Sequence, residues 1–105
     1  MAGLPVKPTL PDFQELVSRL VVERGYSQET VPEVLMLLIE EVGELAKAIR
    51  KLNGQVTHAD SKIHNVEEEL ADCLWLLVDL SNRLDIDLEA AFRAKEAKNK
   101  NRKTV

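Results

Sequence analysis

Residue types that build disulfide networks, tight turns and aromatic clusters are scarce in this sequence of 105 residues. It has four glycines, four prolines and four aromatic residues: Phe13, Tyr26, Trp75 and Phe92. The only cysteine, Cys73, excludes an internal disulfide and a cysteine-based zinc site, and fits a reducing compartment. No apolar run is long enough to span a bilayer, and residues 1–11 lack a signal-peptide pattern. We therefore expect a cytoplasmic protein with no membrane contact.

Positive charge is in the minority. The chain has 14 Lys and Arg against 18 Asp and Glu, which gives a net charge of −4. Because such a surface repels phosphate backbones overall, we expect no nucleic-acid partner. Residues 93–103 are the exception, since they form a basic segment that follows an acidic middle.

The residues that are abundant (Leu, Val, Ala, Glu and Lys) recur with helical spacing and predict an all-α fold. Thr30 and Glu33 form a capping-box signal, and Asp87 is placed to cap a later helix. We expect helices at residues 11–25, 30–52, 66–84 and 88–101, with a polar loop at 55–65. The length fits a single domain over residues 1–105, with 1–10 as a loose arm and 103–105 as a tail.

The second expected helix carries an acidic cluster within an apolar segment. On a helical wheel, Glu41 and Glu44 project from an apolar flank, and Glu40 lies just beyond its edge toward solvent. The expected core stripe beside this flank is Leu35, Leu38, Val42, Leu45, Ile49 and Leu52.

The third expected helix repeats the arrangement. Glu69 projects close to Leu76 and Leu80, and Asp72 lies between Leu76 and Trp75. In each pair the acids are three residues apart, so they are neighbours on the helix surface. If the two helices pack antiparallel, four carboxylates converge and require a counter-ion. Oxygen ligands of this kind suit Mg²⁺ or Mn²⁺, although solvated surface charge explains the same pairs and both readings remain open.

Basic residues on the fourth helix offer a complement. Its apolar side also carries Lys95, Lys98, Asn99 and Arg102, which would suit phosphate groups. Cations near a helix C-terminus also simply complement the helix dipole, and from the residues alone this second explanation is the stronger one.

Taken together, these motifs resemble those of the MazG-like all-α nucleoside triphosphate pyrophosphohydrolases. The resemblance rests on Glu40-Glu41-x-x-Glu44, on Glu69-x-x-Asp72 and on the closing segment at residues 84–102, and it covers about residues 13–102. It implies a MazG-like four-helix bundle completed by oligomerisation, as a homodimer or homotetramer. The implied reaction is Mg²⁺-dependent hydrolysis of an NTP or dNTP to the monophosphate and pyrophosphate, with Mn²⁺ as a substitute ion, in cleansing of the nucleotide pool.

The resemblance also implies residue roles. Metal ligands would be Glu41, Glu44, Glu69 and Asp72; catalytic residues Glu40 and Glu41; triphosphate-binding residues Lys95, Lys98, Asn99 and Arg102. Glu40 would assist either as a further ligand or by orienting and deprotonating the attacking water. Asp85 stands where relatives often carry Gly, which should affect only the helix turn.

Other features have no clear counterpart in that family. The loop with His58, Asp60 and His64 matches nothing, and exposed loop histidines explain it best. Phe13, Gln14 and Trp75 are candidates for a nucleotide pocket, although Phe13 and Trp75 fit the core better.

The main alternative is a non-catalytic helical interaction module in which the acids are surface charge. A di-iron carboxylate bundle is excluded, because it needs Glu-x-x-His pairs and neither His58 nor His64 follows a Glu at that spacing.

Overall fold

The structure, a computed structural model, describes residues 3–54 and 64–102. It contains α1 (Leu10–Glu23), α2 (Val31–Leu52), α3 (His64–Arg83) and α4 (Leu88–Asn101), and no strand occurs within those two ranges. The all-α prediction with four helices is therefore confirmed. None of the helices in this described part is long and apolar enough to cross a membrane.

Short polar side chains fix where the helices begin. Thr9 caps α1 in a capping box with Asp12, so this helix begins slightly before the predicted position. Thr30 and Glu33 form the predicted capping box of α2, and Asp87 accepts a hydrogen bond from the Ala90 amide at the start of α4.

The predicted loop at residues 55–65 is only partly described. His64 and Asn65 belong to α3, so the loop was predicted two residues too long at this end. Residues 55–63, with His58 and Asp60, lie outside the described residues.

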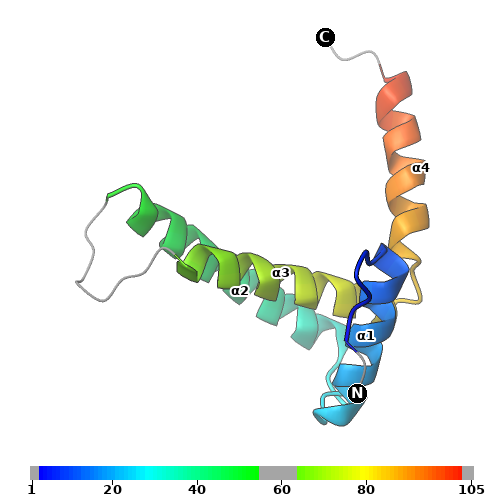
Figure 1. Cartoon of the computed structure of the whole chain (residues 1–105), viewed down its shortest axis with the longest axis horizontal. Coiled ribbons are helices and arrows are strands. Elements are labelled where there is room, and N and C mark those ends of the chain that lie inside the picture. Colours follow the sequence, from blue (N-terminus) through cyan, green and yellow to red (C-terminus); the bar gives the residue numbers. More distant parts are fainter. Residues whose placement is uncertain (1–2, 55–63, 103–105) are drawn as a thin grey trace.

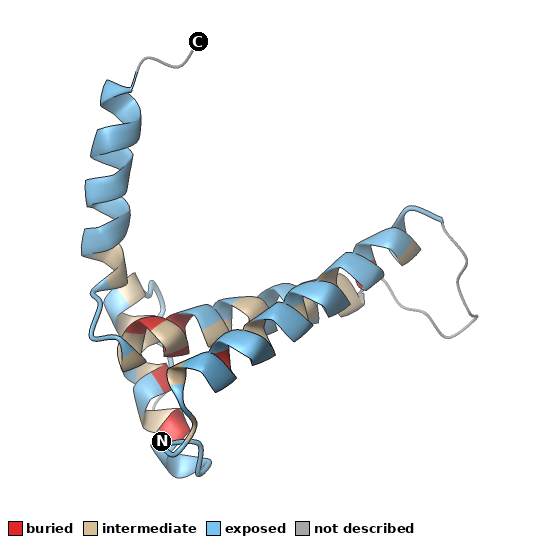
Figure 2. Ribbon diagram, turned by 180° about the vertical axis from the view of Figure 1, so that it is seen from behind, coloured by how far each residue is buried: buried red, intermediate tan, exposed pale blue. Residues whose placement is uncertain are grey.

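Helices α2 and α3 lie side by side along most of their length, and α1 crosses the end of the pair (Figure 1). The core forms at that crossing, where Val17, Val21 and Val78 are buried and Phe13, Trp75 and Leu88 pack against them. Helix α4 extends away from the pair and is exposed over nearly its whole length (Figure 2).

The face of α2 that packs within the chain differs from the predicted core stripe. Val34 and Ala48 are buried, whereas Leu35, Val42 and Ile49 are 41–50% exposed. The helical wheel showed the predicted core stripe and the apolar flank beside it. A wheel does not say which of these two surfaces packs against another helix of the same chain. The predicted stripe remains largely uncovered.

The single chain has an open shape. Its radius of gyration is 16.6 Å, whereas a compact domain of this length has about 13 Å. Its accessible surface is 8054 Å², against roughly 5,900 Å² for a compact monomer of this mass. Large apolar side chains of α2 and α3 are among the exposed residues: Leu35, Met36, Ile39, Val42, Ile49, Leu70, Leu74 and Leu77.

The turn between α3 and α4 is held by Gln14 of α1. Its side-chain nitrogen donates to Asn82 Oδ1 and to the Ile86 carbonyl, both at 2.9 Å, and its oxygen accepts from the Leu88 amide at 3.0 Å. Gln14 is therefore a structural residue of this turn, and its candidate role in a nucleotide pocket stays a prediction. Asp85 in the same turn has φ 58°, which explains why a glycine suits this position.

Candidate metal centre

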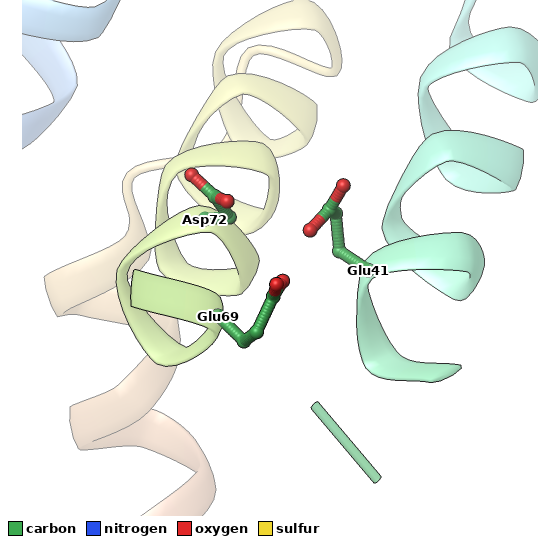
Figure 3. A group of neighbouring side chains, drawn as sticks. All are labelled: Glu41, Glu69 and Asp72. Atoms are coloured by element: carbon green, nitrogen blue, oxygen red, sulfur yellow. The ribbon is translucent and has the colours of Figure 1, made fainter. Parts of the chain in front are cut away.

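Three carboxylates from two helices meet between α2 and α3. Glu41 of α2 points toward Glu69 and Asp72 of α3 (Figure 3), and one oxygen of each lies within 4.8 Å of the others. This cluster of Glu41, Glu69 and Asp72, called the acidic cluster below, is formed within one chain.

Helical spacing explains the position of each acid. Val34, Glu41 and Ala48 are seven residues apart and therefore share the face that packs against α3. Glu69 and Asp72 are three residues apart on α3, so both can be directed to one point. The predicted convergence of the two helices thus occurs for three of the four proposed metal ligands.

The acidic cluster changes the ionisation of Glu41. The pKa of Glu41 is raised from 4.5 to about 7, first by its hydrogen bond with Glu69 and second by burial. The negative charges of Glu69, Asp72 and Glu44 act in the same direction. Without a cation, this carboxyl group therefore tends to keep its proton near neutral pH.

A second observation also fits a cation. Among residues 3–54 and 64–102, the Oε1 atom of Glu69 is buried without a hydrogen-bond partner. An acceptor in that state costs free energy unless something positive or a donor satisfies it. An orphaned buried oxygen beside a carboxyl that resists ionisation is the arrangement expected of hard-cation ligands, and an all-oxygen set suits Mg²⁺ or Mn²⁺.

Cys73 follows Asp72 directly. Burial raises the pKa of its thiol, and the negative charges of Glu41, Glu69 and Asp72 raise it further. The thiolate is therefore disfavoured, which makes Cys73 a poor nucleophile.

The two other predicted acids of α2 lie outside this cluster. Glu44 is exposed, yet its charge contributes to the raised pKa of Glu41, so it lies near the edge of the site. Glu40 is exposed, as its position toward solvent on the wheel predicted.

Of the four residues predicted for the triphosphate, Lys95, Lys98 and Asn99 lie on α4 and Arg102 caps its C-terminus, and all are exposed. Because α4 points away from the α2–α3 pair (Figure 1), one chain does not bring these residues to the acidic cluster. Asn99 donates to Glu96 of its own helix at 3.2 Å.

A pocket of about 390 Å³ opens beside the acidic cluster. Glu41 and Asp72 lie in its lining together with residues from α3 and from the α1–α2 loop. The others that line it are Arg24, Tyr26, Glu29, Leu37, Trp75 and Leu76. Its mixture of two aromatic rings with charged groups suits a ligand that is partly apolar and partly anionic.

Arg24, Tyr26 and Glu29 were not predicted as site residues. A signal was available, because Tyr26 is one of four aromatic residues and follows the helix-ending Gly25, outside any apolar stripe. Trp75 both packs against the core, as predicted, and lines the pocket.

Comparison with known proteins identifies relatives over most of the chain. The chain is 36% identical over 86 residues to YpjD of Bacillus subtilis (strain 168), covering 79% of this chain and 76% of that protein. It is 34% identical over 104 residues to dCTP pyrophosphatase 1 of Bos taurus and 35% identical over 101 residues to that of Homo sapiens. These matches cover 94% and 91% of this chain, but only 62% and 59% of the two mammalian proteins.

Solved structures agree with the fold. A crystal structure of YpjD from Bacillus subtilis superposes with a TM-score of 0.78 at 31% identity, covering 93% of this chain and 99% of that chain. The Bacillus-conserved MazG protein, a nucleotide pyrophosphohydrolase, gives a TM-score of 0.76 at 27% identity, with 95% and 97% covered. The MazG nucleotide pyrophosphohydrolase domain family matches residues 29–105. With this match and these relatives, the chain belongs to the MazG nucleotide pyrophosphohydrolase domain family.

Proposed function

We propose that this protein is a Mg²⁺-dependent nucleoside triphosphate pyrophosphohydrolase that converts an NTP or dNTP to the monophosphate and pyrophosphate. The observation that carries the proposal is the acidic cluster, because three carboxylates within 4.8 Å across two helices require a cation to ionise together. In a family of nucleotide pyrophosphohydrolases, that cation has a direct chemical use.

Glu41, Glu69 and Asp72 would hold the metal, with Glu44 joining from the edge of the cluster. The proposed Mg²⁺ (or Mn²⁺ as a substitute) supplies charge neutralisation to the phosphates. The carboxylates would hold the metal between α2 and α3, and the unpartnered Glu69 Oε1 is one oxygen that the metal would satisfy.

The reaction breaks one phosphoanhydride bond. A water oxygen bonds to the α-phosphorus, and the bond from that phosphorus to the oxygen bridging to the β-phosphorus breaks. Pyrophosphate leaves, and the proton of the attacking water passes to Glu40. The exposed position of Glu40, next in sequence to Glu41, is compatible with a base that works on water at the edge of the site.

The pocket next to the acidic cluster is our candidate for the nucleoside. Tyr26 and Trp75 offer aromatic surface for a base, and Arg24 adds a positive charge near the phosphates. Because relatives include dCTP pyrophosphatases of mammals, dCTP is the first substrate to test.

Assembly is part of the proposal. Lys95, Lys98, Asn99 and Arg102 would contact the triphosphate of a site on another copy, because their own helix extends away from their own acids. The uncovered apolar faces of α2 and α3 favour a homodimer or homotetramer that brings the two together.

A panel of standard and modified NTPs and dNTPs with Mg²⁺, scored for pyrophosphate release, tests the proposal. We expect release from at least one of them, together with the matching monophosphate. No release from any nucleotide by folded, assembled protein would contradict the enzyme and favour a helical interaction module instead. In that module Mg²⁺ would also leave the thermal stability unchanged.

A further inference from the structure

A buried ion pair near the end of α3 has no role in the proposed chemistry. Asp79 is only 2% exposed, and its Oδ1 atom accepts a hydrogen bond from Arg83 Nε at 2.9 Å. Burying two charges is costly unless their remaining hydrogen-bonding groups are also satisfied. The partners of Arg83 therefore indicate what the pair holds in place.

Those partners lie in the loop between α1 and α2. Arg83 Nη2 donates to the Tyr26 carbonyl at 2.8 Å, and Nη1 donates to the Glu29 carbonyl. The Glu29 carboxylate lies 3.8 Å from Nη2. We call Asp79, Arg83 and these two carbonyls the Arg83 clamp.

The clamped loop forms one wall of the pocket beside the acidic cluster, because Tyr26 and Glu29 both line it. Another part of the lining comes from Trp75 and Leu76 of α3. One helix therefore carries two carboxylates of the cluster, one part of the pocket lining and the clamp for the wall formed by the loop. Asp72 and Arg83 are eleven residues apart, which is roughly 16 Å along a helix.

We propose that Arg83 is a positioning residue for the nucleoside: it fixes the wall formed by Tyr26 and Glu29 relative to the acidic cluster. This rests on the proposed function, in which the same pocket receives the nucleoside. The planar guanidinium donates in several directions at once, so it can bridge Asp79 and two carbonyls. A lysine at this position would keep the positive charge but lose the planar set of donors that bridges Asp79 and the two carbonyls.

The test is Arg83→Lys, with Arg93→Lys as the matched control. Arg93 also pairs with an acid four residues away, Glu89 at 2.9 Å, but on exposed α4. For Arg83→Lys we expect dCMP affinity, measured calorimetrically, to fall about tenfold, the effect of one lost hydrogen bond. KM for dCTP should rise by the same factor with kcat within twofold.

Binding of Mg²⁺ and of pyrophosphate should remain unchanged in Arg83→Lys, since neither ligand needs the nucleoside wall. Arg93→Lys should match the wild type in every readout. Unchanged dCMP affinity in Arg83→Lys would overturn the proposal, and so would equal losses for dCMP, Mg²⁺ and pyrophosphate, which indicate a general structural role.

If Arg83→Lys does not fold, Asp79→Asn tests the proposal instead. This change removes the negative charge that anchors the guanidinium but keeps a hydrogen-bond acceptor. Weaker dCMP binding with unchanged Mg²⁺ binding supports the clamp, and unchanged dCMP binding overturns it. Failure of the proposed function is read separately, from a wild type that hydrolyses no nucleotide whether or not it binds dCMP. A wild type that does not bind dCMP overturns the clamp as well.

Discussion

Glu41 lies on the same face of α2 as two buried residues, Val34 and Ala48, each seven positions away. A carboxyl at such a position must either keep its proton or find a cation. Its pKa of about 7 reflects the first state, and the orphaned oxygen of Glu69 beside it fits the second. Through Glu41, the proposed binding of metal would therefore be linked to the stability of the fold.

This link predicts how stability varies with pH. Because the pKa of Glu41 is raised from 4.5 in the unfolded chain to about 7 in the folded one, the folded state holds this proton more tightly. The resulting stabilisation is present below pH 4.5 and is lost as pH rises to about 7. In EDTA, the Glu41 contribution to the free energy of unfolding should thus be larger at pH 5 than at pH 7.5, as urea denaturation measures.

The control for this prediction is Glu41→Gln, which has the same shape and no titration. The difference between wild type and this variant should change with pH, and Mg²⁺ should stabilise only the wild type at pH 7.5. A constant difference across pH 5–7.5 would contradict the raised pKa.

The acids could be predicted from the sequence because helical spacing fixes angular position. Glu41, Glu69 and Asp72 were identified from the wheel and the pair spacing, and these three converge. The pocket residues Tyr26 and Glu29 could not be found in this way, because they lie in a loop whose path depends on hydrogen bonds to Arg83, far away in sequence.

The boundaries of the helices could be predicted from neighbouring residues, whereas the packing of the helices against one another could not. Thr30 and Asp87 were recognisable caps because capping depends on neighbouring residues. The direction of α4 depends instead on Gln14, 67 or more residues away from the groups it holds. The periodic pattern of apolar residues in the sequence does not predict such a contact.

Gln14→Leu should therefore destabilise the junction of α1, α3 and α4. It leaves the Leu88 amide without its acceptor and Asn82 Oδ1 without its donor, so we expect a loss of about 2 kcal/mol in the free energy of unfolding. Urea denaturation measures this loss. Glu15→Leu, an exposed change on the same helix, should stay within about 0.5 kcal/mol of wild type. Equal stabilities for the two variants would contradict the role of Gln14.

At the scale of the whole molecule, the open shape and the uncovered α2 face predict association. Ile49→Lys should weaken this association. Ile49 is 41% exposed on the uncovered stripe of α2 and lies about two turns from Glu41. Light scattering on a sizing column should show the wild type at a multiple of 11.8 kDa and the variant shifted toward 11.8 kDa.

Lys47→Glu serves as the control for association, since it changes charge on the same helix at an exposed polar position. Its mass should equal that of the wild type. If α4 of one copy serves the site of another, hydrolysis should fall together with mass in Ile49→Lys. A monomeric wild type with full activity would contradict the proposed assembly.

Pyrophosphate release from dCTP as a function of Mg²⁺ concentration, in wild type and in Glu69→Gln, tests the role of the acidic cluster most directly. Loss of groups that only support metal ligands costs about 10–100-fold in affinity or activity, so removal of a ligand should cost at least about 100-fold. We predict that wild-type release saturates with Mg²⁺ and stops in EDTA, and that Glu69→Gln, still folded, loses this activity. Release that is independent of Mg²⁺, or that is equal in the two proteins, would contradict a metal centre formed by Glu41, Glu69 and Asp72.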